Sequence, residues 1–184
     1  MIRVAVCDYG AGNVRSVALA FGRLGAEAAV TTDPEVVASA DLAVLPGVGS
    51  AASAMAALRS SSLDQALRER ARAGRTTLGI CLGLQLALDH SEEDGGVDGL
   101  GLLAGRARRL ENGRVPRIGW ARVEPGREEY WFAHSYAADS PAATAWSEGL
   151  VAEVEAEGFL GSQFHPEKSG GAGARYLERC LSLA

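Results

Sequence analysis

Apolar and polar positions follow two different periods along the first half of the chain. Short runs of consecutive apolar residues indicate buried strands, and stretches with apolar residues three and four apart indicate amphipathic helices. The expected strands are Ile2 to Val6, Ala28 to Thr31, Leu42 to Leu45 and Thr76 to Ile80. The expected helices are Val14 to Leu24, a helix that starts at Asp33-Pro34 and ends near Ala40, and Leu63 to Ala73. This alternation predicts an α/β fold with a mostly parallel central sheet flanked by helices on both faces.

The pattern changes from about Ala107 onward. Short strand-like runs there surround the turn pairs Asn112-Gly113 and Pro125-Gly126, which predicts a small antiparallel extension. A last helix is expected over Ala172 to Leu181. No repeat or linker divides the chain, and 184 residues of which 47% are hydrophobic suffice for one core. We therefore expect a single domain over residues 1–184.

Cys81 stands between two glycines in the segment Gly79-Ile80-Cys81-Leu82-Gly83, directly before the apolar run Leu84 to Leu88. Small neighbours are typical of a nucleophile elbow, a sharp strand-to-helix turn in which the backbone passes close to the substrate. A cysteine there lies at a helix N-terminus, where unpaired N–H groups favour the thiolate. The segment predicts a catalytic thiol, with a buried structural cysteine as the alternative.

A second segment, Gln163-Phe164-His165-Pro166-Glu167, supports the catalytic interpretation. Pro166 disfavours a helical conformation for His165, so His165 and Glu167 can project toward the same side. An imidazole held by a carboxylate is the base that a nucleophilic thiol requires. Cys81, His165 and Glu167 are therefore the predicted catalytic triad.

Three segments follow expected strands, and this places them at one edge of the sheet. They are Pro46 to Gly49, Cys81 and His165. Ligands of open α/β sheets bind in the crevice at the carboxyl ends of the strands. We expect the three segments to meet there and to form the active site.

Charge and cysteine content exclude several other classes of protein. The chain has 18 Lys and Arg against 23 Asp and Glu, a net charge of −5, so it lacks the basic footprint of a nucleic-acid-binding protein. Its one basic cluster, Arg106 to Arg117, is interpreted as a solvated edge strand. No apolar stretch is long enough for a membrane span and no leader is recognisable, so we expect a cytoplasmic protein. Cys7, Cys81 and Cys180 are too widely spaced for a disulfide framework or a metal knot, and we expect no metal and no cofactor.

The motifs around the triad resemble those of the class I (triad) glutamine amidotransferases, which hydrolyse the side-chain amide of glutamine and transfer the ammonia to a synthase. The likeness rests on Gly79 to Gln85 and Gln163 to Ser169. Four further stretches resemble the glutaminase subunits of imidazole glycerol phosphate synthases within that family. They are Asp8 to Asn13 with Ser16, Pro46 to Gly49, Val115 to Trp120, and His134 to Tyr136. The resemblance implies a flavodoxin-like amidotransferase fold.

The resemblance also implies roles for residues around the triad. Leu82 N–H is expected to donate to the oxyanion, and Val48 or Gly49 to supply the second donor. Gln85, one helical turn past Cys81, is expected to reach the substrate L-glutamine. Glu93 is the expected partner of the substrate ammonium, with a solvated charge as its alternative. The backbone of Ser135 and Tyr136 is expected to contact the substrate carboxylate, and His134 is expected to be a structural or interface residue.

The chain is too short to hold a synthase domain beside the glutaminase. The resemblance therefore implies a heterodimer with a cyclase subunit, a (β/α)₈ barrel, in histidine biosynthesis. The residues expected at the interface are Asn13, Arg117, Trp120 and Trp131. Arg117, Ile118, Ala121 and Trp131 depart from the residues usual in that subfamily. A glutaminase subunit of another synthase, such as anthranilate or aminodeoxychorismate synthase, and a catalytically silent regulatory module are the alternatives.

Overall fold

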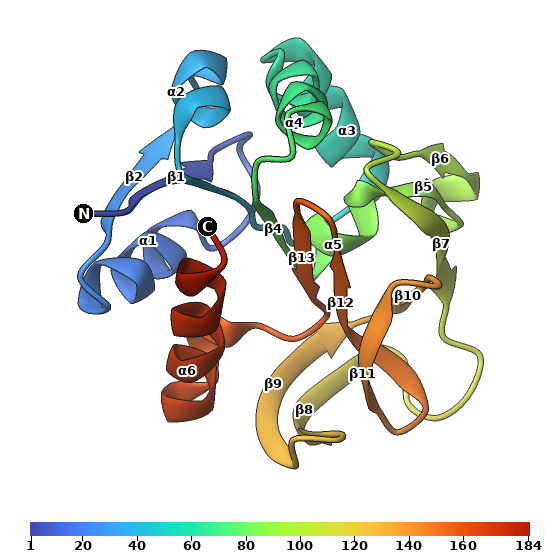
Figure 1. Cartoon of the computed structure of the whole chain (residues 1–184). Coiled ribbons are helices and arrows are strands. Elements are labelled where there is room, and N and C mark those ends of the chain that lie inside the picture. Colours follow the sequence, from blue (N-terminus) through green and yellow to red (C-terminus); the bar gives the residue numbers. More distant parts are fainter.

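The computed structural model describes residues 1–184 and is built around a seven-stranded sheet (Figure 1). The strand order is β11-β12-β13-β4-β3-β1-β2. Its five parallel strands are β1 (Arg3–Cys7), β2 (Glu27–Thr31), β3 (Leu42–Leu45), β4 (Thr77–Ile80) and β13 (Phe159–Ser162). Two antiparallel strands, β11 (Ala143–Ser147) and β12 (Leu150–Ala156), extend the sheet beyond β13. The predicted mostly parallel α/β sheet is confirmed.

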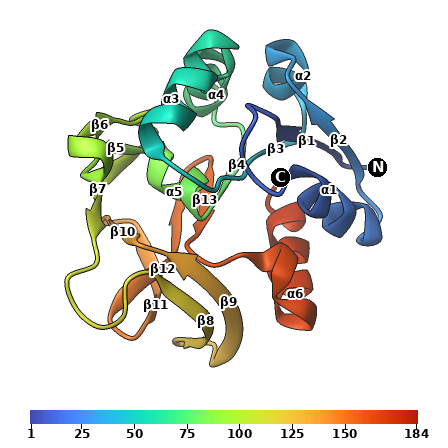
Figure 2. The same cartoon turned by 180° about the vertical axis from the view of Figure 1, so that it is seen from behind.

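Helices cover both faces of this sheet, as Figures 1 and 2 show from opposite sides. One face carries α1 (Val14–Arg23) and α6 (Gly170–Ser182), and the other carries α2 (Pro34–Ser39), α3 (Ala51–Ser60) and α4 (Leu63–Arg72). Successive strand residues point to opposite faces. Val4 and Val6 accordingly pack with α1 and α6, whereas Ala5 and Cys7 pack with α2, α3 and α4. Burial on both faces explains why these strands read as continuous apolar runs.

The predicted elements of the first half agree with the structure to within one or two residues at their ends. The Asp33 side chain accepts a hydrogen bond from Glu35 N–H and Pro34 is the first helical residue, which confirms the predicted start of α2. One helix, α3, was not anticipated. Its sequence is rich in alanine and serine, so few large apolar residues mark its period. Ser50 caps its N-terminus by accepting from Ser53 N–H.

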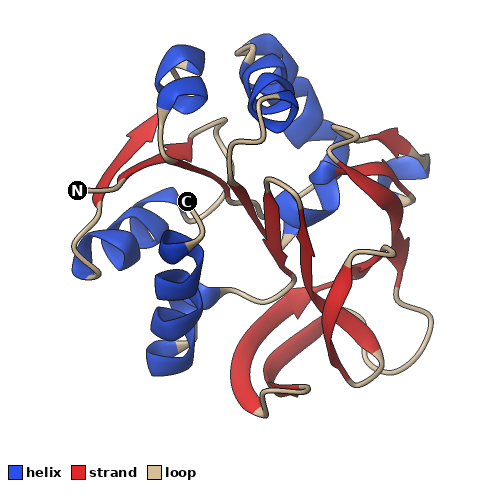
Figure 3. Cartoon of the chain, in the orientation of Figure 1, coloured by secondary structure: helices blue, strands red, loops and turns tan.

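Two smaller sheets lie beside the central sheet, on the right-hand side of Figure 3. A four-stranded sheet has the order β10 (Tyr136–Asp139), β7 (Leu103–Arg109), β5 (Leu88–Ser91), β6 (Val97–Asp98), and its β5–β7 pairing is parallel. A separate hairpin consists of β8 (Arg117–Val123) and β9 (Glu128–His134). The antiparallel extension is thus confirmed, although it starts at Leu88 and contains one parallel pair.

The basic cluster from Arg106 to Arg117 differs from its predicted edge position. Its first residues lie in β7, which is paired on both sides by β10 and β5. The arginine side chains at 106, 108 and 109 are exposed, as expected of a solvated face. The pairing of β7 with β5 and β10 was not predicted, because these two strands come from other segments of the chain, one before and one after β7.

Arg70 on α4 forms a buried charged cluster on the side of the sheet away from the predicted active site. Its side chain is 1% exposed and has no carboxylate partner. The guanidinium donates instead to one hydroxyl and five carbonyl oxygens, those of Thr77 Oγ1, Val37, Ala38, Ala40, Asp41 and Thr76. Burial, together with the nearby charge of Arg75, lowers the pKa of Arg70 to about 10. This cluster ties the end of α2 to the starts of β3 and β4.

The remaining short elements are α5 (Leu82–Ala87) and the 3₁₀ turns η1 (Glu93–Gly95) and η2 (Pro166–Lys168). Of these, α5 contacts strands of both the central and the four-stranded sheet. None of the helices in the structure combines the length and the hydropathy needed to cross a membrane.

Candidate active site

Cys81 lies in the sharp turn between β4 and α5. Its backbone has φ 53° and ψ −107°, a conformation that a residue with a side chain adopts only under strain. The flanking glycines permit the turn, because a Cβ at Gly83 would overlap the carbonyl of Leu45 and one at Gly79 would come within 2.8 Å of Leu84 N. The predicted elbow geometry is confirmed.

His165 and Glu167 lie at the end of β13 beside the elbow. His165 is extended, with φ −99° and ψ 95°, and Pro166 starts the 3₁₀ turn that carries Glu167. His165 Nδ1 is 2.9 Å from Glu167 Oε1, and both side chains are almost completely buried. The neighbouring parallel strands hold thiol and base together, since Cys81 N–H donates to Ser162 O at 2.7 Å.

The charge state of His165 follows from these contacts. Burial lowers its pKa, but hydrogen bonds to Cys81 and Glu167 and the negative charges of both outweigh that effect and raise the pKa to about 9. His165 is therefore an imidazolium at neutral pH when it faces the thiolate. A carboxylate on Nδ1 leaves Nε2 of the ring to face the sulfur.

The sulfur of Cys81 lies between two polar groups besides His165. Ala133 O, on β9, is 3.8 Å from Sγ, and Gln163 Nε2 is 3.6 Å from it. Neither residue was among the predicted site residues. Gln163 stands in the quoted segment two residues before His165, directly at the carboxyl end of β13, and this position was the signal that could have identified it.

A cavity of about 230 Å³ opens at Cys81. The structure brings together at this cavity every residue that was predicted to bind glutamine. These are Val48, Gly49, Leu82, Gln85, Glu93, Ser135 and Tyr136. Its other lining residues were not predicted as parts of the site, and they are Pro116, Ile118, Ala133 and His134.

The loop from Pro46 to Gly49 packs directly on the elbow. A Cβ at Gly47 would lie 2.7 Å from Tyr9 Oη and 2.8 Å from Leu82 Cβ, so only glycine fits there. Tyr9 Oη donates to Pro46 O at 2.6 Å. Gly49 has φ +97°, in the region that favours glycine, and no neighbour lies within 4 Å of its Cβ position. The loop is thus held at Pro46 and Gly47 and has space around Gly49.

Glu93 and Glu92 have different surroundings. Glu93 Oε2 accepts a hydrogen bond from Ala51 N–H at the start of α3, at 2.9 Å, and the residue lines the cavity. Burial raises its pKa, partly offset by the Ala51 hydrogen bond. Glu92 instead accepts from Arg109 N–H, outside the cavity. Of the two glutamates, only Glu93 lies where it could meet a ligand at Cys81.

The bend between β9 and β10 is fixed by its carbonyl groups. Tyr136 O accepts from Gln85 Nε2 at 2.8 Å and from His134 Nδ1 at 2.9 Å, and Ser135 O accepts from Leu110 N–H. Burial lowers the pKa of His134 to about 4 despite the Tyr136 hydrogen bond, helped by the charges of Arg117 and His165. The His134 imidazole is therefore neutral and has a structural role, in which Nδ1–H donates a hydrogen bond to Tyr136 O.

The four residues expected at the partner interface do not share one face. Trp120 and Trp131 are opposite each other in the β8–β9 hairpin and pack edge to face with 6.0 Å between ring centroids. Arg117 pairs with His134 on the other face, where its guanidinium lies 4.3 Å from the Phe132 ring and contacts Glu148 at 3.0 Å. Asn13 precedes α1 at the same edge of the central sheet as Cys81. Arg117 thus faces into the molecule because of the register of β8 against β9. A shift of that register by one residue would turn its side chain to the outer face.

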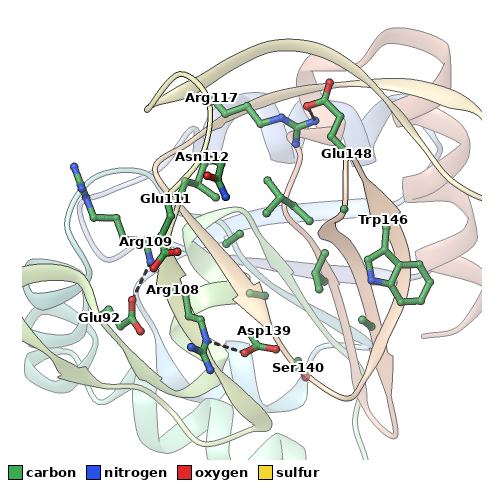
Figure 4. A pocket seen from close by; sticks show the side chains of 18 of the residues that line it. Glu92, Arg108, Arg109, Glu111, Asn112, Arg117, Asp139, Ser140, Trp146 and Glu148 are labelled. Carbon is green, nitrogen blue, oxygen red and sulfur yellow. Dashed lines mark hydrogen bonds and ion pairs between the residues drawn. The ribbon is translucent and has the colours of Figure 1, made fainter.

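A larger cavity of about 830 Å³ lies behind the hairpin, away from Cys81 (Figure 4). Arg108 pairs with Asp139 and Arg117 with Glu148 at this cavity, whereas Arg109 and Arg114, which also line it, form no ion pair. It contains none of the triad residues. The smaller cavity is therefore the candidate active site. The structure contains no cluster of three or more His, Cys, Asp or Glu side chains suited to a metal ion.

Comparison with known proteins gives a consistent picture. The family model described as glutamine amidotransferase class-I matches residues 5–183. The chain is 46% identical to the imidazole glycerol phosphate synthase subunit HisH of Symbiobacterium thermophilum, over 96% of this chain and 92% of that protein. It is 41% identical to the HisH subunit of Methanothermobacter thermautotrophicus, over 98% of each.

Solved structures share the fold at lower identity. A glutamine amidotransferase crystal structure matches with a TM-score of 0.82 at 21% identity, over 97% of this chain and 98% of that one. The structure of PurLQS from Thermotoga maritima matches with a TM-score of 0.77 at 18% identity, over 100% and 99%. At these identities the likeness concerns the fold.

Proposed function

The chain belongs to the class I glutamine amidotransferase family, and from this premise we propose that it is the glutaminase subunit of an imidazole glycerol phosphate synthase in histidine biosynthesis. It hydrolyses L-glutamine to glutamate and ammonia and transfers the ammonia to a cyclase subunit in the cytoplasm. The cyclase forms imidazole glycerol phosphate and an aminoimidazole carboxamide ribotide.

One observation carries the catalytic part of the proposal. Cys81 is held in a strained elbow at the bottom of a cavity, directly beside a buried His165–Glu167 pair. A structural cysteine would need neither the strain nor the charged pair. The other two cysteines illustrate this, since Cys7 and Cys180 are buried in the core, and burial raises the pKa of each to about 12.

In the proposed mechanism the Cys81 thiolate attacks the carboxamide carbon of glutamine. The imidazolium of His165 then protonates the departing ammonia, and the neutral ring later takes a proton from the water that hydrolyses the thioester. Glu167 orients the ring through Nδ1 and stabilises its charged form. A pKa of about 9 supports the first role, because His165 already carries a proton at neutral pH while it faces the thiolate, before the attack.

The tetrahedral intermediate needs N–H donors directed at its oxygen. Leu82 N–H follows the nucleophile at the start of α5, where no side chain caps the helix. The second donor is Val48 or Gly49 N–H. The space around Gly49 supports a loop whose peptide can rotate to complete the oxyanion hole.

Glutamine is proposed to bind along the cavity from Cys81 toward η1. Gln85 lines the cavity beside Cys81, and Glu93 lies where its carboxylate can meet the substrate ammonium. The bend at Ser135 and Tyr136 receives the substrate carboxylate. The fixed carbonyls of this bend support a preformed site.

The partner is proposed to dock on the edge of the sheet around the cavity mouth. Three exposed apolar side chains support this surface: Val48 at 43%, Ile118 at 62% and Trp120 at 55% exposure. Val48 and Ile118 also line the cavity, so a bound partner would cover the exit for ammonia. Trp131 and Asn13 belong to the same surface in this proposal, whereas Arg117 supports the hairpin from behind.

The experiment is reconstitution with the cyclase subunit of an imidazole glycerol phosphate synthase. Cys81→Ala should abolish glutamine-dependent synthesis while ammonium-dependent synthesis continues, because the thiol serves only to release ammonia. Cys180→Ala is the matched control and should keep both activities. Loss of both activities in an intact Cys81→Ala complex would contradict the catalytic assignment, and activity restored only with anthranilate or aminodeoxychorismate synthase would assign another acceptor.

A further inference from the structure

Gln163 is a fully buried polar side chain that the proposed mechanism does not use. It lies at the carboxyl end of β13, one residue past Ser162, whose carbonyl accepts from Cys81 N–H. Its side-chain amide reaches the reacting sulfur with Nε2 3.6 Å from Sγ. A buried amide in this place requires partners for both ends.

The partners determine which end of the amide faces the sulfur. Tyr136 O can only accept, so the Gln85 group 2.8 Å away must be its NH₂. That same NH₂ lies 3.2 Å from the Gln163 side chain, which must therefore present its oxygen to Gln85. The remaining end of Gln163, its NH₂, faces Cys81. A single backbone carbonyl thus sets the direction of the whole chain of amides.

A donor directed at sulfur favours the thiolate over the thiol, because a hydrogen bond to the charged form is the stronger one. The other neutral group at the sulfur, Ala133 O, is an acceptor at 3.8 Å and favours the thiol. Gln163 therefore favours the Cys81 thiolate, as the imidazolium of His165 does, whereas Ala133 O favours the thiol.

We propose that Gln163 is a further positioning residue for the nucleophile, which donates a hydrogen bond from Nε2 to the Cys81 thiolate and is held in that orientation by Gln85 and Tyr136 O. This inference rests on the proposed function for its catalytic meaning. The hydrogen bond itself exists independently of the acceptor that receives the ammonia. It also connects the nucleophile with the bend at Tyr136, which lines the glutamine cavity.

The test is the pH dependence of Cys81 alkylation by iodoacetamide in the full chain, followed by mass spectrometry of the Cys81 peptide. Gln163→Met removes the donor and keeps the approximate size, and the midpoint should move up by about one pH unit. Gln163→Glu can still accept from Gln85 but presents an acceptor to the sulfur, so its midpoint should move further up. Ser162→Ala is the matched control, because it removes a buried hydrogen bond to Phe164 O in the same turn without touching Sγ, and its midpoint should equal that of the wild type.

Unchanged midpoints in folded Gln163→Met and Gln163→Glu would overturn the proposal. A shift in Gln163→Glu alone would also overturn it, because that shift reflects only added negative charge. An equal shift in Ser162→Ala would attribute the effect to general loosening of the turn and would overturn it as well. If Gln163→Met does not fold, Gln163→Asn replaces it, since its shorter side chain cannot make the 3.6 Å contact and should give the same upward shift. Iodoacetamide needs neither glutamine nor a cyclase, so this result is independent of the reconstitution experiment.

Discussion

Two buried charged regions of the molecule differ in how completely their polar groups are satisfied. The Arg70 cluster contains a single positive charge, and its guanidinium nitrogens donate to one hydroxyl and five backbone carbonyls. The region around Cys81 contains two buried polar atoms without a protein hydrogen-bond partner, Glu167 Oε2 and His134 Nε2. The other two such atoms are Arg117 Nη1 at the larger cavity and Asp64 Oδ1 on α4.

The difference indicates that the buried charge of Arg70 serves stability, whereas the buried charges around Cys81 serve catalysis. Each buried polar atom without a partner costs about 1–3 kcal/mol. The Cys81 region carries this cost together with a strained backbone at the nucleophile, whereas the Arg70 cluster carries neither. Mutations in the first region should therefore change activity more than stability, and mutations at Arg70 should do the reverse.

Glu167→Gln should give the largest effect on the activity side. Loss of the carboxylate leaves His165 without control of its tautomer, so turnover of the complex should fall by about 10³- to 10⁴-fold. The free energy of unfolding should change little, because the amide has the same size and shape as the carboxylate and fills the same buried space. Steady-state kinetics and urea denaturation on the same preparation measure both quantities. Turnover equal to the wild type would remove Glu167 from the triad.

Arg70→Met should give the largest effect on the stability side. Five carbonyls and a hydroxyl lose their donor, and the free energy of unfolding should fall by about 3–5 kcal/mol. The pH profile of Cys81 alkylation should stay unchanged while the protein is folded. Arg72→Met, on the exposed side of the same helix, is the control and should change stability by less than about 0.5 kcal/mol. A stable Arg70→Met protein with altered alkylation would reverse the comparison.

The free subunit should be a poor glutaminase that a liganded cyclase accelerates. If the loop at Val48 and Gly49 supplies the second oxyanion donor only in the complex, the gain should be about 10²- to 10³-fold in turnover. Rates of glutamine hydrolysis with and without the liganded partner decide this. A free subunit that already works at the full rate would rule out the switch.

The smallest expected effect is on the pH dependence of stability, through His134, which lines the cavity at Cys81. The pKa of His134 is lowered to about 4, below its value of about 6.5 in the unfolded chain, so unfolded molecules bind the proton first. Its contribution to stability is therefore present above pH 6.5 and is lost as pH falls toward 4. His165 has the opposite shift, and its contribution is lost only as pH rises toward 9, outside this window.

Arg117→Met should make this acid-side loss shallower, because removing the positive charge raises the pKa of His134. Stability measured by denaturant titration between pH 4 and 7 gives the slope. Arg122→Met, exposed on the outer face of the hairpin, should leave the slope unchanged. Equal slopes in Arg117→Met and the wild type would show that Arg117 does not act on His134.

Prediction from the sequence succeeded where the reactive residues and the residues that fix their backbone conformation are neighbours in the chain. The elbow at Cys81 and the His165–Glu167 pair each occupy one short segment whose glycines or proline fix the conformation. Parallel strand order then brings the segments to one edge. The fold and the residues that line the cavity at Cys81 follow from that order.

Prediction was incomplete where position depends on pairing with distant strands. The inward orientation of Arg117 follows from the register of β8 against β9, and the internal place of β7 from β5 and β10. The helix Ala51–Ser60 was missed because alanine and serine carry little hydrophobic contrast. Gln163 was quoted within its motif, but its contact with the sulfur depends on where Gln85 and Tyr136 meet in space.

The insertion of β13 between β4 and β12 has a consequence for how the enzyme is made. Cys81 and His165 are far apart in the chain, yet the parallel pairing of β4 with β13 joins their segments. During synthesis on the ribosome the thiol emerges long before its base, and the sheet has a gap until β13 enters it. Contacts between such distant segments form late in folding. The nascent chain therefore carries a thiol without its base, and glutamine can be consumed only after β13 and the His165–Glu167 segment have been synthesised and folded.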